Sequence, residues 1–251
     1  MKYSICIGAY QEKDVYYHLQ KVKEHNLDGL EYYKWWNLDL RKVAQFQEKL
    51  GVSISAICTR FISLVDEKYR DQYIEGLKET VEACQILGVK SIISQTGNYI
   101  PDKPRDIQLK NMVETLKECA PICEKNNVVL EIEPLNAKIN HPGYFLQRSE
   151  EAKEVIEKVD SPNVRLCFDI YHQQITEGDV TRNAVQLMPL INHYHIADNP
   201  GRTEPGTGEL NYKNILKAIK ANGFKNYVGL ECSFTVDTDD ALRRIIKEVL
   251  P

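Results

Sequence analysis

Short runs rich in β-branched and aromatic residues recur along the chain, and longer amphipathic segments separate them. Within the longer segments, apolar residues return with helical spacing and charged residues occupy the opposite face, as in residues 38–50, 71–87, 111–125 and 240–250. The pattern therefore predicts strands that alternate with helices. The eight predicted strands are residues 3–8, 29–33, 52–58, 89–95, 128–133, 164–169, 191–197 and 227–232.

Alternation of this kind indicates parallel strands joined by right-handed crossovers, and eight units in 251 residues match the size of a closed barrel. We therefore expect an α/β fold, a single (β/α)8 TIM barrel domain over residues 1–251. An open, doubly wound sheet is the competing fold, but no GxGxxG follows the first predicted strand. Gly51 and Gly88 each follow a helical segment and are expected to cap it.

The charge balance argues against a nucleic acid or membrane partner. The chain has 32 Lys and Arg against 36 Asp and Glu, a net charge of −4, and it lacks the apolar run of about 18 residues that a membrane span needs. No secretory signal pattern opens the sequence. The seven cysteines are odd in number and scattered, as in a cytoplasmic protein with reduced thiols. We expect a cytoplasmic protein that binds a small neutral or anionic metabolite.

Four polar residues stand at the ends of the last four predicted strands. They are Glu133, Asp169, His195 and Glu231. Barrel enzymes carry their chemistry at this face, and three acids packed together without a cation would repel one another. A divalent metal removes the repulsion, and a mostly oxygen ligand set suits Mn²⁺, Mg²⁺ or Co²⁺, with Zn²⁺ as a further candidate. Separately satisfied polar residues are the alternative, which four such residues in adjacent units weaken.

Several segments carry a resemblance to a known family. EPLN (133–136), FDIYHQQITEGD (168–179), HYHIADNPGRTEPGTGELNY (193–212) and VGLECSF (228–234) resemble the hydroxypyruvate isomerase branch of the xylose isomerase-like TIM barrel sugar isomerases and epimerases. The likeness is dense in the C-terminal half. Before residue 90 only the barrel pattern and the run YIEGLKETVEACQILGVKSI are similar.

The resemblance implies roles for individual residues. It assigns the divalent metal to Glu133, Asp169, His195 and Glu231, with the two glutamates also acting as the acid and base. It further implies that His172 and Arg202 contact the substrate. Arginine presents paired planar donors, which suit a substrate carboxylate or vicinal hydroxyls. Dimers and tetramers are common in the family, so a homo-oligomer is compatible with the resemblance.

The expected chemistry is proton transfer next to a carbonyl. A carboxylate cannot remove such a proton unaided, so a metal must bind the carbonyl and hydroxyl oxygens and stabilise the enediolate. Return of the proton to the neighbouring carbon gives isomerisation, with hydroxypyruvate and tartronate semialdehyde as the expected pair. Return to the same carbon gives epimerisation, as in ketose 3-epimerases. The hydroxypyruvate branch often has Gln where His195 stands, whereas ketose epimerases have His, so both substrate classes stay open.

Two other functions share the fold. An endonuclease IV-like phosphodiesterase needs a histidine-rich zinc cluster and a basic surface, whereas this chain has six histidines and a net negative charge. A non-catalytic sugar-binding barrel is the second, and the intact pair of glutamates argues against it.

Glu131 lies two positions before Glu133 and shares its face of the predicted strand. An unpaired carboxylate inside the barrel would be costly. We therefore expect Glu131 to pair with Arg165 or His193, which the same alternation points inward.

Overall fold

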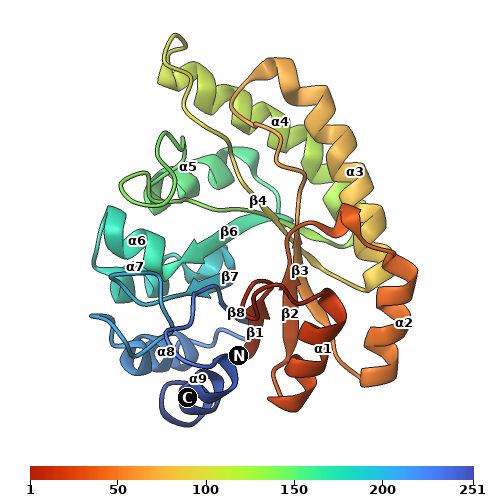
Figure 1. The fold of residues 1–251 in the computed structure, drawn as a ribbon. Helices are drawn as coiled ribbons and strands as arrows, with labels where there is room; N and C mark the ends of the chain where they lie inside the picture. The colour runs from red at the N-terminus through yellow and green to blue at the C-terminus, as the bar shows by residue number, and fades with distance from the viewer.

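Eight parallel strands close into one barrel in the chain order β1 to β8 in the computed structural model, which describes residues 1–251 (Figure 1). β1 closes the ring because it pairs with both β2 and β8. The expected (β/α)8 barrel is confirmed. The strands are β1 (Lys2–Cys6), β2 (Gly29–Tyr32), β3 (Ile54–Cys58), β4 (Ser91–Ser94), β5 (Val129–Ile132), β6 (Val164–Asp169), β7 (Ile191–Ile196) and β8 (Tyr227–Leu230).

Helices surround the ring of strands and cover its outer face (Figure 1). No helix is long and apolar enough to cross a membrane. The α-helices are α1 (Val15–Glu24), α2 (Leu40–Leu50), α3 (Arg70–Leu87), α4 (Arg105–Asn126), α5 (Ser149–Val159), α6 (Ile170–Thr176), α7 (Val180–Gln186), α8 (Tyr212–Ala221) and α9 (Thr238–Glu248). Three short 3-10 helices are η1 (Trp35–Asn37), η2 (Glu67–Tyr69) and η3 (Met188–Leu190).

Gly51 and Gly88 end α2 and α3 in the left-handed conformation, with φ of 67° and 70°. The prediction that both are C-caps is therefore confirmed. Val52 N–H donates to Gln47 O at 3.2 Å, and Val89 N–H donates to a carbonyl of α3 in the same way. These valines belong to the helix caps rather than to the following strands, which explains why β3 and β4 begin two residues later than the pattern predicts.

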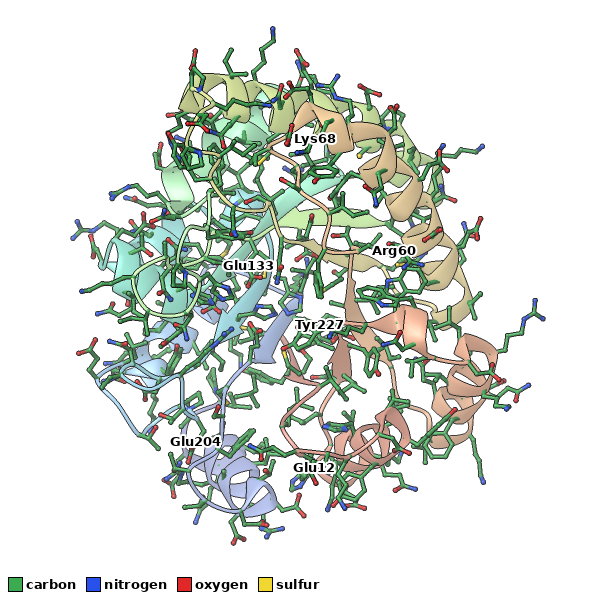
Figure 2. All side chains as sticks on the ribbon, turned by 45° about the horizontal axis from the view of Figure 1, so that its top comes forward. Glu12, Arg60, Lys68, Glu133, Glu204 and Tyr227 are labelled. Carbon is green, nitrogen blue, oxygen red and sulfur yellow. The ribbon has the colours of Figure 1, made fainter.

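The two faces of each strand meet different surroundings. Leu130 and Ile132 of β5 face outward and are fully buried in the apolar core between strands and helices. Glu131 and Glu133 alternate with them and face the barrel interior. That interior is largely polar on this side, because His193 and His195 of β7 are buried there as well. Figure 2 places Glu133 near the centre of the ring of strands.

The predicted pairing of Glu131 with Arg165 or His193 is wrong. Glu131 Oε1 accepts a hydrogen bond from Asn192 Nδ2 at 2.7 Å, and no ion pair joins Glu131 to either expected partner. Arg165 is the register partner of Glu131 on β6. Each layer inside a TIM barrel is built from alternate strands, so a direct register partner does not share the layer. Burial raises the pKa of Glu131, which favours its neutral form.

Candidate metal centre

The barrel mouth brings together the four residues predicted as metal ligands. Glu133, Asp169, His195 and Glu231 each offer one ligand atom, and these four atoms lie within 4.8 Å of one another. They lie within one residue of the carboxyl ends of four consecutive strands, β5 to β8, as the sequence pattern predicts. Glu133, Asp169 and His195 are at most 6% exposed, so water screens their charges poorly. Convergence of this kind provides the geometry that one bound ion needs.

His195 stands at the centre of this cluster. Its Nδ1 lies 2.8 Å from Glu133 Oε1 and 3.1 Å from Glu231 Oε2. Its Nε2 points the other way, toward Glu31 Oε2 at 2.8 Å. Nδ1 is therefore the imidazole nitrogen that faces the carboxylates of the cluster, Glu133 and Glu231.

The protein does not stabilise the negative charges of Asp169 and Glu231 equally. Burial raises the pKa of Asp169, and the neighbouring Glu231 adds to this effect against the pull of Arg202. Burial acts in the same direction on Glu231, but there Arg202 and His195 outweigh it and hold the pKa well below its usual range. Arg202 and His195 thus stabilise the ionised form of Glu231, whereas the neighbouring Asp169 is shifted toward its neutral form.

A divalent cation fits these residues. Asp169 Oδ2 is buried and has no hydrogen-bond partner, which leaves a carboxylate oxygen free at the point where the other three ligand atoms converge. Three carboxylates and one imidazole form a hard donor set of the kind that binds Mn²⁺, Mg²⁺ or Co²⁺. The same ion would remove the charge imbalance between Asp169 and Glu231.

Arg202 also reaches the cluster, from the loop between β7 and α8. Its Nη2 lies 2.9 Å from Glu231 Oε2 and 3.8 Å from Asp169 Oδ2. The sequence predicts Arg202 as a substrate contact and does not show that its guanidinium rests on a predicted metal ligand. A substrate carboxylate at the mouth would compete with Glu231 for this guanidinium.

The loop that carries Arg202 is held by Asp198, which is fully buried. Asp198 Oδ1 accepts hydrogen bonds from Asn199 N and Leu210 N, both at 3.0 Å. Asp198 Oδ2 accepts from Gly206 N at 2.8 Å and Thr207 N at 3.1 Å. Four backbone N–H groups converge on one carboxylate, which positions the loop over the barrel mouth.

His172 lies in the first turn of α6, next to Asp169, and is fully buried. Asn136 donates its backbone N–H to His172 Nδ1 at 3.3 Å, so Nδ1 is the accepting nitrogen. Burial lowers the pKa of His172 to about 3, so the ring is neutral and its proton is on Nε2. His172 Nε2 has no hydrogen-bond partner and lies 3.5 Å from Asp169 Oδ2. It can donate to a substrate oxygen next to the cluster.

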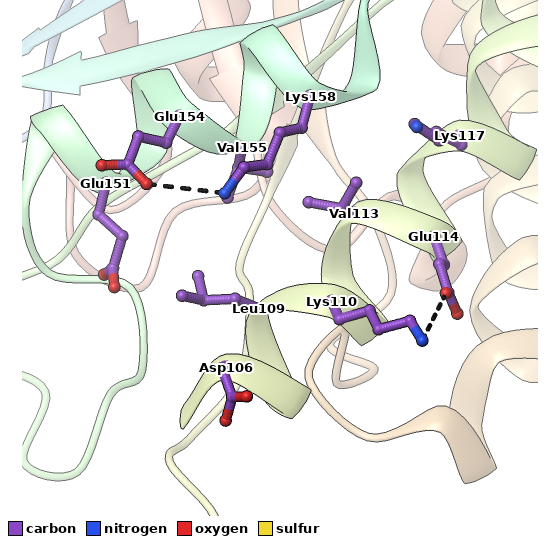
Figure 3. A pocket seen from close by; sticks show the side chains of 10 residues that line it. All are labelled: Asp106, Leu109, Lys110, Val113, Glu114, Lys117, Glu151, Glu154, Val155 and Lys158. Atoms are coloured by element: carbon purple, nitrogen blue, oxygen red, sulfur yellow. Dashed lines mark ion pairs between the residues drawn. The ribbon is translucent and has the colours of Figure 1, made fainter. Parts of the chain in front are cut away.

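One cavity lies at the barrel mouth and another lies on the outer surface, away from the predicted site residues. One of about 270 Å³ is lined by Tyr33, Arg202 and Glu231. Another, of about 340 Å³, lies on the outer face between α4 and α5, over Leu109 and Val155 (Figure 3). Charged side chains with ion pairs of their own ring the outer cavity, and it contains none of the predicted site residues. The cavity at the mouth is therefore the candidate substrate site.

Two residues of the mouth are not among the predicted site residues. Tyr33 donates its hydroxyl to Glu231 Oε1 at 3.0 Å, and Glu31 contacts His195 as described above. Glu31 lies in β2 and Tyr33 comes directly after this strand. The two residues are two positions apart, so their side chains point to the same face. Glu31 lies inside the predicted strand 29–33, but the sequence pattern cannot show which side chain across the barrel it meets.

Comparisons with known proteins show which proteins the chain resembles. The sequence model of the family described as xylose isomerase-like TIM barrel matches residues 19–248. A protein of Escherichia coli (strain K12) named hydroxypyruvate isomerase is 33% identical over 178 residues, 71% of this chain and 67% of that protein. A Cupriavidus necator protein named 2-oxo-tetronate isomerase is 32% identical over 151 residues, 60% of this chain and 58% of that protein. The matched part spans 58–67% of the length of these curated relatives, and 62% of that of a human relative.

Solved structures share the fold over almost the whole chain. A structure titled AP endonuclease, family 2, from Brucella melitensis has a TM-score of 0.93 at 21% identity and covers 99% of this chain and 100% of its own. A D-psicose 3-epimerase from Clostridium cellulolyticum H10, with D-tagatose, has a TM-score of 0.82 at 19% identity and covers 97% of this chain and 89% of its own. At such identities the likeness shows the fold alone.

We predict that Asp198 controls the order of the loop that carries Arg202. Asp198→Ala removes the acceptor of four backbone N–H groups and should speed amide hydrogen exchange at Gly206, Thr207 and Leu210. Asp198→Asn keeps one oxygen and should give an intermediate rate. Hydrogen exchange followed by mass spectrometry compares the loop with the strand amides, which should be unchanged. Equal loop exchange in the wild type and both variants would contradict this role.

Proposed function

Because the chain belongs to the xylose isomerase-like TIM barrel family, we propose that it is a divalent-metal-dependent isomerase of small hydroxy-carbonyl acids. The proposed reaction is a 1,2-proton transfer through an enediolate, with hydroxypyruvate and tartronate semialdehyde as the best candidate pair. The convergence of four ligand atoms from Glu133, Asp169, His195 and Glu231 carries the proposal. The names of both curated relatives denote isomerases of small oxo acids, which supports the substrate class.

Glu133, Asp169, His195 and Glu231 would hold Mn²⁺, Mg²⁺ or Co²⁺, or else Zn²⁺. The bound ion would supply Lewis acidity that polarises the substrate carbonyl and makes the neighbouring C–H more acidic.

Glu133 and Glu231 are the proposed acid and base. They come from β5 and β8, which are separated in the barrel by two strands, so they reach the mouth from different sides. One carboxylate takes the proton from the hydroxyl-bearing carbon, and a proton then returns to the former carbonyl carbon. The hydroxyl proton moves to the former carbonyl oxygen, so that the old hydroxyl becomes the new carbonyl. No atom is gained or lost, so the product is an isomer of the substrate. Glu231 keeps its ionised form through Arg202 and His195, which suits it to begin as the base.

His172 and Arg202 are the proposed substrate contacts. The Nε2–H of His172 has no partner in the protein and can donate to a substrate hydroxyl or carbonyl oxygen. Arg202 offers a planar pair of donors beside Glu231 and can bind a substrate carboxylate. A guanidinium at this place favours a substrate that has a carboxylate over a neutral sugar.

A ketose 3-epimerase is the second candidate. The specific observation in its favour is the imidazole of His195 in the cluster, since the resemblance assigns His to ketose epimerases at this place. In that reaction the proton returns to the carbon from which it came. We expect a small-molecule substrate in either case and no nucleic acid partner, because the net charge is −4.

The first test is deuterium uptake from D₂O. Wild-type protein with Mn²⁺ should incorporate deuterium into hydroxypyruvate at carbon and convert it to tartronate semialdehyde, both visible by NMR. Glu133→Gln and Glu231→Gln each remove an acid or base and should lower the exchange rate about 10²- to 10⁴-fold.

Two controls distinguish a specific loss of the site from a loss of folded protein. Glu154→Gln changes an exposed carboxylate of α5 and should exchange like the wild type. Chelation should abolish exchange, and added Mn²⁺, Mg²⁺ or Co²⁺ should restore it. Retained exchange in Glu133→Gln or Glu231→Gln would exclude that residue as acid or base. Uptake with ketoses but not with hydroxypyruvate would favour the epimerase.

Arg202→Lys tests whether the guanidinium binds a substrate carboxylate. Hydroxypyruvate has this group, whereas dihydroxyacetone is a three-carbon ketose without it. Loss of a charge-assisted, paired contact should lower kcat/KM for hydroxypyruvate about 10- to 100-fold and leave the exchange rate with dihydroxyacetone nearly unchanged. An equal fall for both substrates would show instead that Arg202 acts through Glu231.

A further inference from the structure

A second buried acid lies on the far side of His195 from the predicted ligands. Glu31 of β2 is 1% exposed, and both of its oxygens are engaged. Glu31 Oε2 lies 2.8 Å from His195 Nε2, and Glu31 Oε1 lies 3.0 Å from His193 Nε2. Ser4 Oγ also donates to Glu31 Oε1, at 2.6 Å. Cys6 Sγ donates to Glu31 Oε2 at 3.4 Å, so the carboxylate faces two imidazoles, one hydroxyl and one thiol.

The backbone around Glu31 leaves room for this carboxylate. Gly229 of β8 has no side chain there, and a Cβ at this position would lie 1.9 Å from Glu31 Oε1. In β2 the strand register shifts between Leu30 and Glu31. Such irregularities redirect side chains at barrel rims and near active sites. Two separate features of the barrel thus allow Glu31 to reach the imidazoles from below.

The chemistry of the imidazole links Glu31 to the cluster. A neutral imidazole has one N–H and one lone pair, and only the nitrogen with the lone pair can bind a metal. Glu31, Glu133 and Glu231 can only accept as carboxylates, so an ion bound at Nδ1 would take the place of a proton there, and Glu31 would hold the remaining proton of His195 on Nε2. His195 Nδ1, which faces Glu133 and Glu231, then presents its lone pair to the cluster.

We propose that Glu31 is the positioning residue of the metal centre: it fixes the His195 ring and keeps its proton on Nε2, so that Nδ1 can bind the ion. The inference rests on the proposed function, because it assumes an ion among Glu133, Asp169, His195 and Glu231. Carboxylates that hold metal-bound histidines in this way tune both orientation and basicity. Glu31 itself would touch neither the ion nor the substrate.

Metal affinity gives the direct test, with Mn²⁺ alone as the probe and calorimetry of the apo-protein as the measurement. Glu31→Gln keeps one acceptor oxygen for two imidazoles and should weaken Mn²⁺ binding about tenfold, and Glu31→Leu keeps none and should weaken it up to about 100-fold. Gly229→Ala replaces none of the four ligand residues but displaces the Glu31 carboxylate, so it should also weaken binding. Ser4→Ala removes a contact only to Oε1 and is the matched control, with affinity close to that of the wild type.

The tautomer of His195 gives a readout that lost stability alone would not change. In the ¹⁵N-histidine-labelled wild type with Zn²⁺, His195 should show a protonated Nε2 and a metal-bound Nδ1, with the signals identified by their absence from His195→Gln. In Glu31→Leu the Nε2–H signal should shift and exchange faster with water. A wild type that binds Zn²⁺ through Nε2, or Glu31 variants with unchanged Mn²⁺ affinity, would overturn the inference. Failure of the wild type to bind Mn²⁺ at all would instead overturn the metal centre, and the inference with it.

Discussion

Repulsion between carboxylates that share one buried mouth is the constraint on which the rest of the site depends. Glu133, Asp169 and Glu231 bring their oxygens together within 4.8 Å. At a separation of about 4 Å two unit charges repel by about 4 kcal/mol when the effective dielectric constant is about 20. The barrel cannot release this repulsion by moving the acids apart, because each is attached to the end of its own strand and the ring of strands is closed. Positive charge must therefore come to the acids.

The protein supplies part of that charge from two directions. Arg202 approaches Glu231 from the loop above, and Asp198 holds that loop through four backbone hydrogen bonds. His195 approaches from within the barrel and is held from below by Glu31. Arg202 Nη2 lies 3.8 Å from Asp169 Oδ2, beyond hydrogen-bond distance, so this buried oxygen has no hydrogen-bond partner. In the proposed metal centre a divalent ion at this point would complete the neutralisation and would free Arg202 to meet a substrate carboxylate.

Periodicity in the sequence predicts a large part of this arrangement. Apolar runs predict all eight strands, and the alternation along β5 to β8 predicts that Glu133, Asp169, His195 and Glu231 share the mouth. Periodicity does not predict contacts across the barrel. Glu131 meets Asn192, the residue at which the register between β6 and β7 shifts. The layering of alternate strands separates Glu131 from Arg165, and His193 contacts Glu31 instead. Contacts between β2 and β7, or between a loop and β8, depend on the closed ring in the same way, so the positions of Glu31 and Arg202 come only from the structure.

Anomalous diffraction from a crystal grown with Mn²⁺ tests the metal centre most directly. The structure and its chemistry predict one strong anomalous peak at the barrel mouth, within about 2–2.6 Å of one ligand atom each from Glu133, Asp169, His195 and Glu231, with His195 bound through Nδ1. A peak confined to the acidic side chains of the outer cavity between α4 and α5, or no peak at all, would contradict the metal centre on which the proposed isomerase chemistry depends.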